Sequence, residues 1–591
     1  MLSLTAIALL LASTASSLPQ WGWGWPGHRP PHNPGHNHGS PVTTTVNLGY
    51  STYEGTQLSP ANVLQYLGIA FAAPPLGNLR WRAPQDPPHT NGVQPADAFQ
   101  PTCLGYFGGG LSDSVNEDCL YLNVFAPANA TTESKLPVWF FIQGGGYAGD
   151  TDQNFNFTEV VERSGYGMVA VQINYRVGAF GFLASEKVRE NGDLNVGLLD
   201  QRKAMHWVQQ YIHLFGGDPD HVVIHGDSAG AGSVAFHLTA YGGRDDHLFV
   251  GGISESPFWP THRTVSEMEF QFERFAQNIS CDPAENADVM ACLRSKDTAT
   301  LQGSDVTSPF PDAPSTPNPS WYFLPVIDGT FSTDYLYNLF EQGKLVRVPL
   351  IVGDDTDEGT GFAINANTSS QFLDFMDANY PKLGNSTLQK ISQAYPENGF
   401  GAPIAHGPYF PATAAAYGES TFICPGIQMA SSLSKYNSAA KTWNYRYNVQ
   451  DQALIAAGLG VPHVSEKPAI WGPNNAGACG EPCSYLTYNA NIVPVMMSYW
   501  ISFILDLDPN TYKVRQAPEW KPFQSQGSGH GWGGWGGWGG WGGWHGGHGG
   551  SGGDEVQRLV IQTNATRMEN IPSAQLQRCE LWQSLAEVTE Q

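Results

Sequence analysis

Short apolar runs alternate along this chain with longer amphipathic stretches. Four of the runs contain only apolar residues, and they cover residues 138–142, 168–171, 222–224 and 350–352. This alternation is typical of a mostly parallel sheet covered by helices. Glycine, asparagine or aspartate follows each run within three residues. Functional groups in an open α/β sheet collect beyond the carboxyl ends of the strands, so we expect the chemistry directly after these runs.

The run 222–224 leads into residues 226–230, which read Gly-Asp-Ser-Ala-Gly, and a helix-compatible stretch follows at 233–238. Strand, Gly-x-Ser-x-Gly and helix form the pattern of a nucleophile elbow, with Ser228 as the nucleophile. The serine must project from a sharp turn, and side chains two residues to either side would collide with the backbone. A pentapeptide recurs by chance in a glycine-rich chain, so other residues must support this interpretation.

A serine hydroxyl needs a base, and the base needs an acid to orient it. In a fold with this elbow the order along the chain is serine, carboxylate, histidine. The acids of residues 354–358 follow the run 350–352, and spacing does not decide among Asp354, Asp355, Asp357 and Glu358. Beyond them, three histidines belong to a Gly/Trp tract, namely His530, His545 and His548. The candidate bases are therefore His406 and His463, and His463 lies in a glycine-punctuated loop suited to presenting a side chain.

The oxyanion that forms when serine attacks a carbonyl also needs hydrogen-bond donors. Residues 143–147, Gln-Gly-Gly-Gly-Tyr, follow the run 138–142 and offer backbone N–H groups with no Cβ in the way. Ala229, directly after Ser228, offers another. The same glycines could instead form only a tight turn.

Charge and the N-terminus limit the classes of function. Of the 591 residues only 14% are charged, and 53 acidic against 29 basic side chains give a formal charge of −24. Such a surface repels phosphate backbones, so we expect no binding of nucleic acid. Residues 1–17 resemble a secretory signal peptide. No later stretch approaches the roughly 20 apolar residues of a membrane helix, and we expect a soluble, secreted, extracellular protein without an integral membrane segment.

Glycosylation signals and cysteines agree with export. Six asparagines begin Asn-x-Ser/Thr acceptors, namely Asn129, Asn156, Asn278, Asn367, Asn385 and Asn564. The eight cysteines form an even set that an oxidising compartment would pair, but spacing alone assigns no pair.

Two segments depart from the composition of the rest. Residues 18–41 are rich in Trp, Gly, Pro and His, and residues 527–553 repeat tryptophan at a period of three. Glycine at this density costs too much backbone entropy for a packed element, so we interpret the first as a low-complexity stalk and the second as a disordered insertion. The alternative is an adhesive or metal-chelating tail, which the histidine cluster between residues 28 and 38 would suit.

Several further motifs resemble the type-B carboxylesterases, the family of cholinesterases and of fungal lipases and esterases. They occur at residues 68–77, 117–124, 174–176, 200–201, 215–219 and 323–329. The resemblance extends from about residue 42 to the C-terminus, apart from the Gly/Trp tract, and is most marked to secreted fungal members. It implies an α/β-hydrolase fold in which one catalytic domain, residues 42–591, contains a large mostly parallel central sheet flanked by helices.

The resemblance also implies roles for individual residues. It makes Ser228 the nucleophile, Glu358 the acid and His463 the base, with Gly145, Gly146 and Ala229 as the oxyanion hole. It implies hydrolysis of a small-molecule or lipid ester through an acyl-enzyme, with no cofactor and no metal, and it leaves the oligomeric state open. Asp227 stands where the family commonly has glutamate, and Gln143 also departs from the family pattern.

The cysteine spacing is similar to that of the family. The resemblance implies pairs Cys103–Cys119 and Cys281–Cys292, a third pair Cys424–Cys579 as in cholinesterases, and by elimination Cys479–Cys483. In the lipases of this family the first disulfide loop carries a long helical lid, but here only fifteen residues lie between Cys103 and Cys119. We therefore expect an esterase with an open gorge. The alternatives are an interfacial triacylglycerol lipase and a non-catalytic binding protein of the same fold.

Overall fold

The structure is a computed structural model. It describes residues 39–107, 109–152, 155–402, 404–437, 441–477, 479, 482–524 and 556–591. The expected signal peptide at 1–17, the stalk up to residue 38 and the insertion at 527–553 lie outside the described residues.

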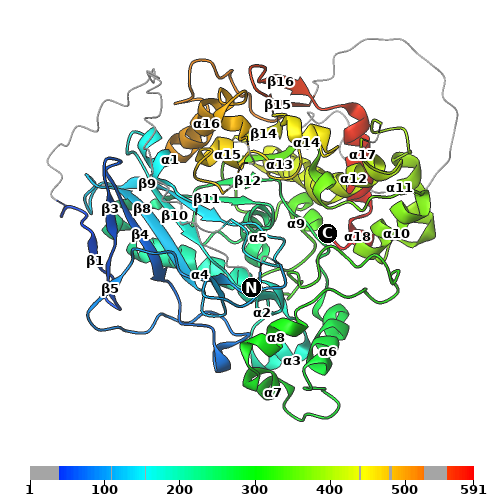
Figure 1. Cartoon of the computed structure of the whole chain (residues 1–591), viewed down its shortest axis with the longest axis horizontal. Helices are drawn as coiled ribbons and strands as arrows, with labels where there is room; N and C mark the ends of the chain where they lie inside the picture. The colour runs from blue at the N-terminus through cyan, green and yellow to red at the C-terminus, as the bar shows by residue number, and fades with distance from the viewer. Residues whose placement is uncertain are drawn as a thin grey trace, which may run out of the picture. The chain divides into compact units, whose positions relative to one another are not determined.

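A mixed sheet of eleven strands forms the centre of the described chain, in the order β16-β15-β14-β13-β12-β11-β9-β10-β8-β4-β3. The strands from β15 to β10 in this order are parallel, and antiparallel strands complete the sheet at both ends. In Figure 1 the blue strands β3 and β4 mark one end and β16 the other. The bounds are β3 Thr56–Leu58, β4 Val63–Ala70, β8 Tyr121–Pro127, β9 Leu136–Ile142, β10 Val169–Ile173, β11 Gly217–Asp227, β12 Gly251–Glu255, β13 Leu350–Asp355, β14 Thr442–Tyr447, β15 Gln557–Ile561 and β16 Arg567–Asn570.

Two smaller sheets contain the remaining strands. They are β1 Thr45–Asn47, β2 Thr52–Glu54 and β5 Val93–Pro95 in one sheet, and β6 Thr102–Cys103 and β7 Val115–Asn116 in the other. The four apolar runs of the sequence fall on the neighbouring strands β10, β9 and β11 and on β13, so the expected mostly parallel sheet is confirmed. Strand β10 continues past the apolar run to Ile173, because Gln172 and Ile173 pair with both β8 and β9. The buried amide of Gln172 donates to the Asp152 carbonyl at 2.6 Å.

Helices cover both faces of the sheet because successive side chains of each strand point to opposite faces. In β9, Val138 and Phe140 belong to one apolar cluster, whereas Trp139 and Phe141 belong to the other. The first cluster includes residues of α4 Val196–Tyr211, α5 Ala229–Gly243, α9 Leu336–Glu341 and α13 Cys424–Tyr436. The second includes residues of α1 Thr158–Arg163, α15 Lys467–Trp471 and α16 Ile492–Asp506.

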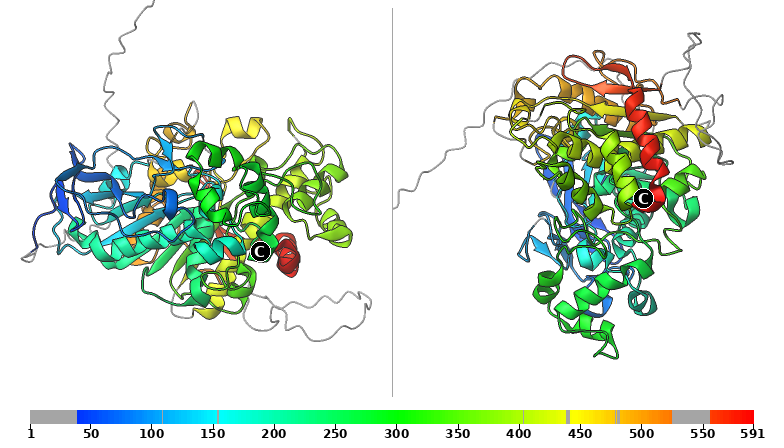
Figure 2. Two further views of the ribbon diagram at one scale, coloured as in Figure 1. Left: turned by 90° about the horizontal axis from the view of Figure 1, so that it is seen from below. Right: turned by 90° about the vertical axis from the view of Figure 1, so that its right-hand side faces the viewer.

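The remaining helices surround these layers. They are α2 Gly178–Phe182, α3 Glu186–Asn191, α6 Glu269–Asn278, α7 Val289–Ser295, α8 Thr298–Ser304, α10 Ser369–Asn379, α11 Gly384–Ala394, α12 Phe410–Gly418, α14 Gln452–Ala456, α17 Ser573–Ser584 and α18 Ala586–Thr589. Single turns of 3₁₀-helix occur at η1 Gly77–Leu79, η2 Ile212–Phe215, η3 Val265–Met268, η4 Glu358–Gly361 and η6 Ser484–Leu486, and the π-helical turn η5 Glu419–Ile423 joins α12 to α13. Figure 2 shows α17, in red, on the outside of the fold, where it packs against α13.

Four disulfides are present among the described residues, and they are the pairs that the family resemblance implies. They are Cys103–Cys119, Cys281–Cys292, Cys424–Cys579 and Cys479–Cys483. The third ties α17, the helix before α18, to α13 across 155 positions of the sequence.

Candidate active site

Ser228 lies in a sharp turn between β11 and α5. Its backbone has φ 53° and ψ −119°, a conformation that residues with side chains rarely adopt. A Cβ on Gly226 would lie 2.2 Å from the backbone of Gly230, and a Cβ on Gly230 would lie 1.9 Å from the carbonyl oxygen of Ile142. Both flanking positions therefore require glycine, as expected for an elbow. The helix begins directly at Ala229, four residues before the helix-compatible stretch in the sequence.

The Glu358 carboxylate contacts the imidazole of His463. Glu358 begins η4 just after β13, and His463 lies in the loop between α14 and α15. The imidazole Nδ1 donates to Glu358 Oε2 at 2.5 Å, while Glu358 Oε1 accepts from the backbone N–H of Asp355 at 2.6 Å. Because a carboxylate only accepts, Nδ1 carries the proton and Nε2 is left as an acceptor. That Nε2 is buried and has no hydrogen-bond partner among the described residues.

Two other acids of residues 354–358 bind the backbone of the segment that carries His463 and not its imidazole. Asp357 Oδ2 accepts from the backbone N–H of Val461 at 2.8 Å, and Asp355 Oδ2 accepts from that of Ser465 at 3.1 Å. The alternative base, His406, stacks on Phe410 with ring centroids 3.8 Å apart and binds the carbonyl of Ala457. The geometry therefore pairs His463 with Glu358.

An aromatic cluster joins the surroundings of Ser228 to those of His463. The carbonyl of Ser228 accepts from the backbone N–H of Phe258 at 3.1 Å. The ring of Phe258 lies 5.7 Å from that of Phe422, which lies 4.2 Å from the imidazole of His463. Trp321 contacts this cluster through Phe258 at 5.4 Å. These contacts form a continuous aromatic cluster from the backbone of Ser228 to the imidazole of His463.

The glycines after β9 leave backbone N–H groups free beside Ser228. Gly145 has φ +116° and Gly146 has φ +64°, and a Cβ on Gly146 would lie 2.0 Å from the Trp321 ring. A Cβ on Gly144 would lie 2.9 Å from Cβ of Ser228, so this loop packs directly on the elbow. Within the described part of the chain, the N–H groups of Gly145, Gly146 and Ala229 donate to no protein atom. Ala229 also begins α5, whose N-terminus favours negative charge.

Gln143, which departs from the family pattern, is completely buried below this loop. Its Nε2 donates to the carbonyl of Ile173 at 3.2 Å and to Asn174 Oδ1 at 3.1 Å. Its Oε1 accepts from the backbone N–H of Asp152 at 3.2 Å. Gln143 therefore anchors the start of the glycine loop to its neighbours.

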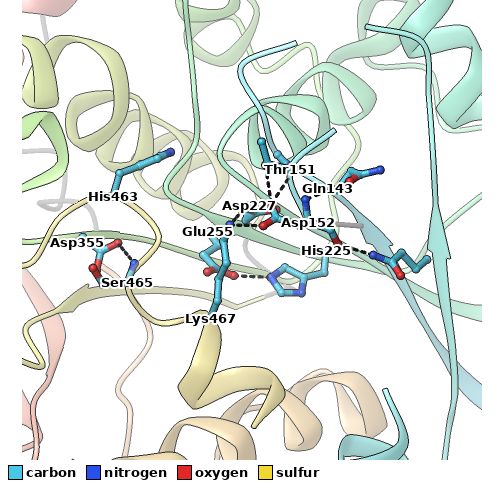
Figure 3. Close-up of polar contacts among 12 residues, drawn as sticks. Gln143, Thr151, Asp152, His225, Asp227, Glu255, Asp355, His463, Ser465 and Lys467 are labelled. Atoms are coloured by element: carbon cyan, nitrogen blue, oxygen red, sulfur yellow. Dashed lines mark hydrogen bonds and ion pairs between the residues drawn. The ribbon is translucent and has the colours of Figure 1, made fainter. Parts of the chain in front are cut away.

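A group of buried ionisable side chains lies behind the elbow, and Figure 3 shows it. Lys467 Nζ lies 2.5 Å from Asp152 Oδ1 and 2.9 Å from Asp227 Oδ2. On the next strand, Glu255 accepts from His225 Nε2 at 3.0 Å. His225 Nδ1 in turn accepts from the indole N–H of Trp139 at 3.0 Å, and burial lowers the pKa of His225 to about 3.

Sequence reasoning missed this group. Neither hydrophobic periodicity nor motif spacing distinguishes Lys467 and Asp152 from surface charges, because both lie in irregular or short segments. The one available signal was the position of Asp227 inside the elbow, since a carboxylate at that place is enclosed by strand and helix.

The six asparagines of the glycosylation signals are all exposed to solvent. Among the described residues, no helix is both long and apolar enough to cross a membrane. The same residues contain no cluster of His, Cys, Asp or Glu that could hold a metal ion.

Comparison with known proteins identifies relatives over most of the chain. The model of the "Carboxylesterase family" matches residues 42–530. Lipase 2 of Geotrichum candidum is 33% identical over an alignment of 498 residues, and the match covers 75% of this chain and 84% of that protein. Secreted lipase 4 of Gibberella zeae is 29% identical over 82% of this chain and 86% of its own. The crystal structure of Aspergillus niger EstA is similar with a TM-score of 0.85 at 50% identity, and the match covers 93% of this chain and 99% of that one.

Proposed function

The chain belongs to the carboxylesterase family and is a carboxylic ester hydrolase, and on this premise we propose that Ser228, His463 and Glu358 perform the hydrolysis. Nε2 of His463 takes the proton of the Ser228 hydroxyl as the oxygen attacks the ester carbonyl. Glu358 stabilises the imidazolium that forms. The N–H groups of Gly145, Gly146 and Ala229 stabilise the negative charge on the carbonyl oxygen.

The second half of the reaction uses the same groups. The imidazolium of His463 protonates the alkoxide leaving group, which departs as an alcohol and leaves an acyl group on Ser228. His463 then takes a proton from water as the hydroxide attacks the acyl carbonyl. The bond between the acyl carbon and Ser228 Oγ breaks, the imidazolium returns its proton to that oxygen, and the carboxylic acid leaves. Proton transfers balance within this pair, so this sequence of steps invokes no cofactor or metal.

The observation that carries the proposal is the 2.5 Å bond between His463 Nδ1 and Glu358 Oε2. It fixes the tautomer in which Nε2 is a free acceptor, and Ser228 is held in a turn that residues with side chains rarely adopt. The free N–H groups of the glycine loop support the assignment of the oxyanion hole. Buried polar groups are usually paired, so an acceptor and three donors that find no partner among the described residues support a role in binding substrate.

Ser228→Ala tests the proposal directly. We expect this variant to lose hydrolysis of p-nitrophenyl butyrate, by a factor of roughly 10⁴ or more, because no other oxygen can form the acyl-enzyme. Circular dichroism checks its fold. Ser295→Ala, at an exposed serine, is the matched control and retains activity. Undiminished turnover in folded Ser228→Ala would refute the assignment, and a fluorophosphonate that labels wild type but not Ser228→Ala also excludes the non-catalytic binding protein.

An esterase is favoured over an interfacial lipase by the first disulfide loop. Between Cys103 and Cys119 the structure describes every residue except Gly108, and these described residues contain the strand β7 and no helix. Without a helical lid, activity should not depend on a lipid surface. We therefore propose that soluble short-chain esters are hydrolysed without a rate increase on emulsification, and a jump in rate on emulsified triglyceride would favour the lipase.

We further propose that the protein is secreted and glycosylated, with residues 42–591 as one catalytic domain. The signal-like residues 1–17, the six exposed acceptor asparagines and the four disulfides support this location. Expression in a fungal host should place the protein in the medium, with a mass that falls on treatment with an endoglycosidase.

A further inference from the structure

Lys467 contacts two chain segments that are far from it in sequence, and both belong to the proposed active site. It is the first residue of α15, four positions after His463. Its ammonium lies 2.9 Å from Oδ2 of Asp227, the residue before Ser228. It also lies 2.5 Å from Oδ1 of Asp152, whose other oxygen accepts from the backbone N–H of Gly144 at 3.3 Å. Figure 3 shows the lysine extending from its helix toward the side chains of Asp227 and Asp152.

The segments that meet at Lys467 are packed without spare room. A Cβ on Gly144 would lie 2.8 Å from Asp227 Oδ2, so the aspartate of the elbow lies directly against the glycine loop. Asp152 is tied to the same loop, because its backbone N–H donates to Gln143. A shift of either carboxylate would therefore move the nucleophile relative to the free N–H groups.

The ammonium of Lys467 also affects the protonation of the carboxyl groups around it. Burial acts to raise the pKa of Asp152, but the charge of Lys467 and the hydrogen bonds from Asp227, Lys467 and Thr151 together outweigh burial and leave that pKa below its ordinary value. For Asp227, burial and then the charge of Asp152 raise the pKa well above its usual range. Burial likewise raises the pKa values of Glu255 and Glu466, which are also close by. Lys467 thus supplies positive charge to a place rich in carboxyl groups.

We propose that Lys467 is a positioning residue for ester hydrolysis. Its ammonium holds the elbow, the glycine loop and the segment of His463 in one arrangement, so that the nucleophile, the oxyanion donors and the base stay aligned. This inference rests on the proposed function, because alignment has a meaning only if these three groups act together. Loss of this alignment should weaken stabilisation of the transition state more than it weakens binding of the substrate in the ground state.

Lys467→Met tests this role because methionine has a similar length and no charge. We expect kcat for p-nitrophenyl butyrate to fall at least tenfold while KM changes less than threefold. The inhibition constant of a trifluoromethyl ketone, which forms a tetrahedral adduct at the serine, should rise by the same factor as kcat/KM falls. Lys441→Met removes an exposed lysine that is paired with Asp508, and it serves as the matched control with unchanged kinetics.

The variant Asp152→Asn/Lys467→Met separates alignment from charge balance and provides a second test if Lys467→Met does not fold. It loses one buried cation and one buried carboxyl group together, so the charges of the site change less than in Lys467→Met and the variant should fold, yet it lacks the bridge and should keep the low kcat. Recovery of wild-type kcat in this variant, or wild-type kcat in folded Lys467→Met, would overturn the proposal. If wild type itself neither hydrolyses esters nor reacts with a fluorophosphonate at Ser228, the proposed function fails instead.

Discussion

Trp321 is the residue that bounds the space above the glycine loop. Its ring would overlap any Cβ at Gly146, and it also contacts Phe258 and Phe362. Its indole N–H donates to the hydroxyl of Tyr417 at 3.1 Å, which holds the ring in place. Because this rigid ring lies beside the proposed oxyanion donors, we expect it to limit the size of the acyl group that can reach them.

Trp321→Ala should widen this space. We expect kcat/KM for a p-nitrophenyl ester of an eight-carbon acid to rise relative to the acetate by about tenfold, since each methylene accommodated in an apolar pocket contributes on the order of 1 kcal/mol. Steady-state kinetics with the two esters measure the ratio. Tyr417→Phe removes the hydrogen bond to the indole of Trp321 but keeps the ring volume. We expect a smaller change in the ratio for this variant, and the difference between the two variants measures the effect of the added space. An unaltered ratio in Trp321→Ala would place the acyl group elsewhere.

His225 makes the stability of the protein sensitive to acid. Burial lowers its pKa to about 3, whereas an unfolded histidine titrates near 6.5. The stability from this neutral histidine is present above about pH 6.5 and is lost as pH falls toward 3, because the unfolded chain takes up a proton that the folded chain does not.

His225→Gln keeps an acceptor for Trp139 and a donor for Glu255 but does not titrate. As pH falls from about 6 to about 4, the free energy of unfolding of wild type should therefore drop by about 1.4 kcal/mol per pH unit more than that of the variant. Urea unfolding at each pH gives the free energy of unfolding of both proteins. Both contain the same buried carboxyl groups, so the contribution of these groups cancels in the difference. Parallel pH profiles would mean that His225 is protonated in the fold.

Residues could be predicted from the sequence where the chemistry requires particular residue types at neighbouring positions. The elbow requires glycine at 226 and 230, and the structure shows the backbone atoms that enforce this. The contact that Asp357 makes could not be predicted from such a local pattern. Its carboxylate accepts from the N–H of Val461, a contact between loops about a hundred residues apart, and spacing within the acidic cluster has no information about it.

At the scale of helices and strands, the apolar runs located the four strands but not their ends. Strand β11 extends back to Gly217, five residues before its apolar run, because the parallel neighbour β9 also pairs with this polar stretch at Leu136. Likewise α5 starts at Ala229 rather than at 233, since Gly230 and Gly232 are tolerated in a helix that packs closely on β9 and on the Phe258 backbone. Close packing, which the sequence pattern does not report, decided both boundaries.

The disulfide between α13 and α17 should contribute more stability than the short one near α16. In a chain-entropy treatment, closing a loop of 155 residues contributes about 5 kcal/mol and closing one of four residues about 2 kcal/mol. Cys424→Ala/Cys579→Ala should therefore lower the free energy of unfolding by about 3 kcal/mol more than Cys479→Ala/Cys483→Ala. Chemical unfolding of the two variants, prepared in parallel, gives the comparison. Equal losses would show that residual structure in the unfolded chain dominates.

At the scale of the whole molecule, the Gly/Trp tract is bracketed by well-packed elements. Before it, the backbone N–H of Phe523 donates to Thr442 of β14, and after it β15 pairs with the same strand. The tract itself lies outside the described residues, so its interpretation as a disordered insertion stays a prediction. The proposed active site draws on none of its residues.

Replacing the tryptophans at 532, 535, 538, 541 and 544 by serine should leave hydrolysis of soluble esters unchanged. We expect kcat/KM for p-nitrophenyl butyrate within about twofold of wild type, because the elements that hold Ser228, Glu358 and His463 all lie elsewhere. Binding to cellulose or chitin particles, measured on the same two proteins, tests the adhesive alternative. A loss of activity on the soluble ester would assign the tract to the catalytic machinery.

The bond between Cys424 and Cys579 has a consequence for proteolysis of the protein. Its two cysteines stand on opposite sides of the stretch from residue 525 to residue 555. A protease that cuts once within that stretch therefore produces two polypeptides that remain covalently joined. The nicked protein would migrate as one band on a non-reducing gel and as two after reduction, and the smaller fragment would contain β15, β16 and α17.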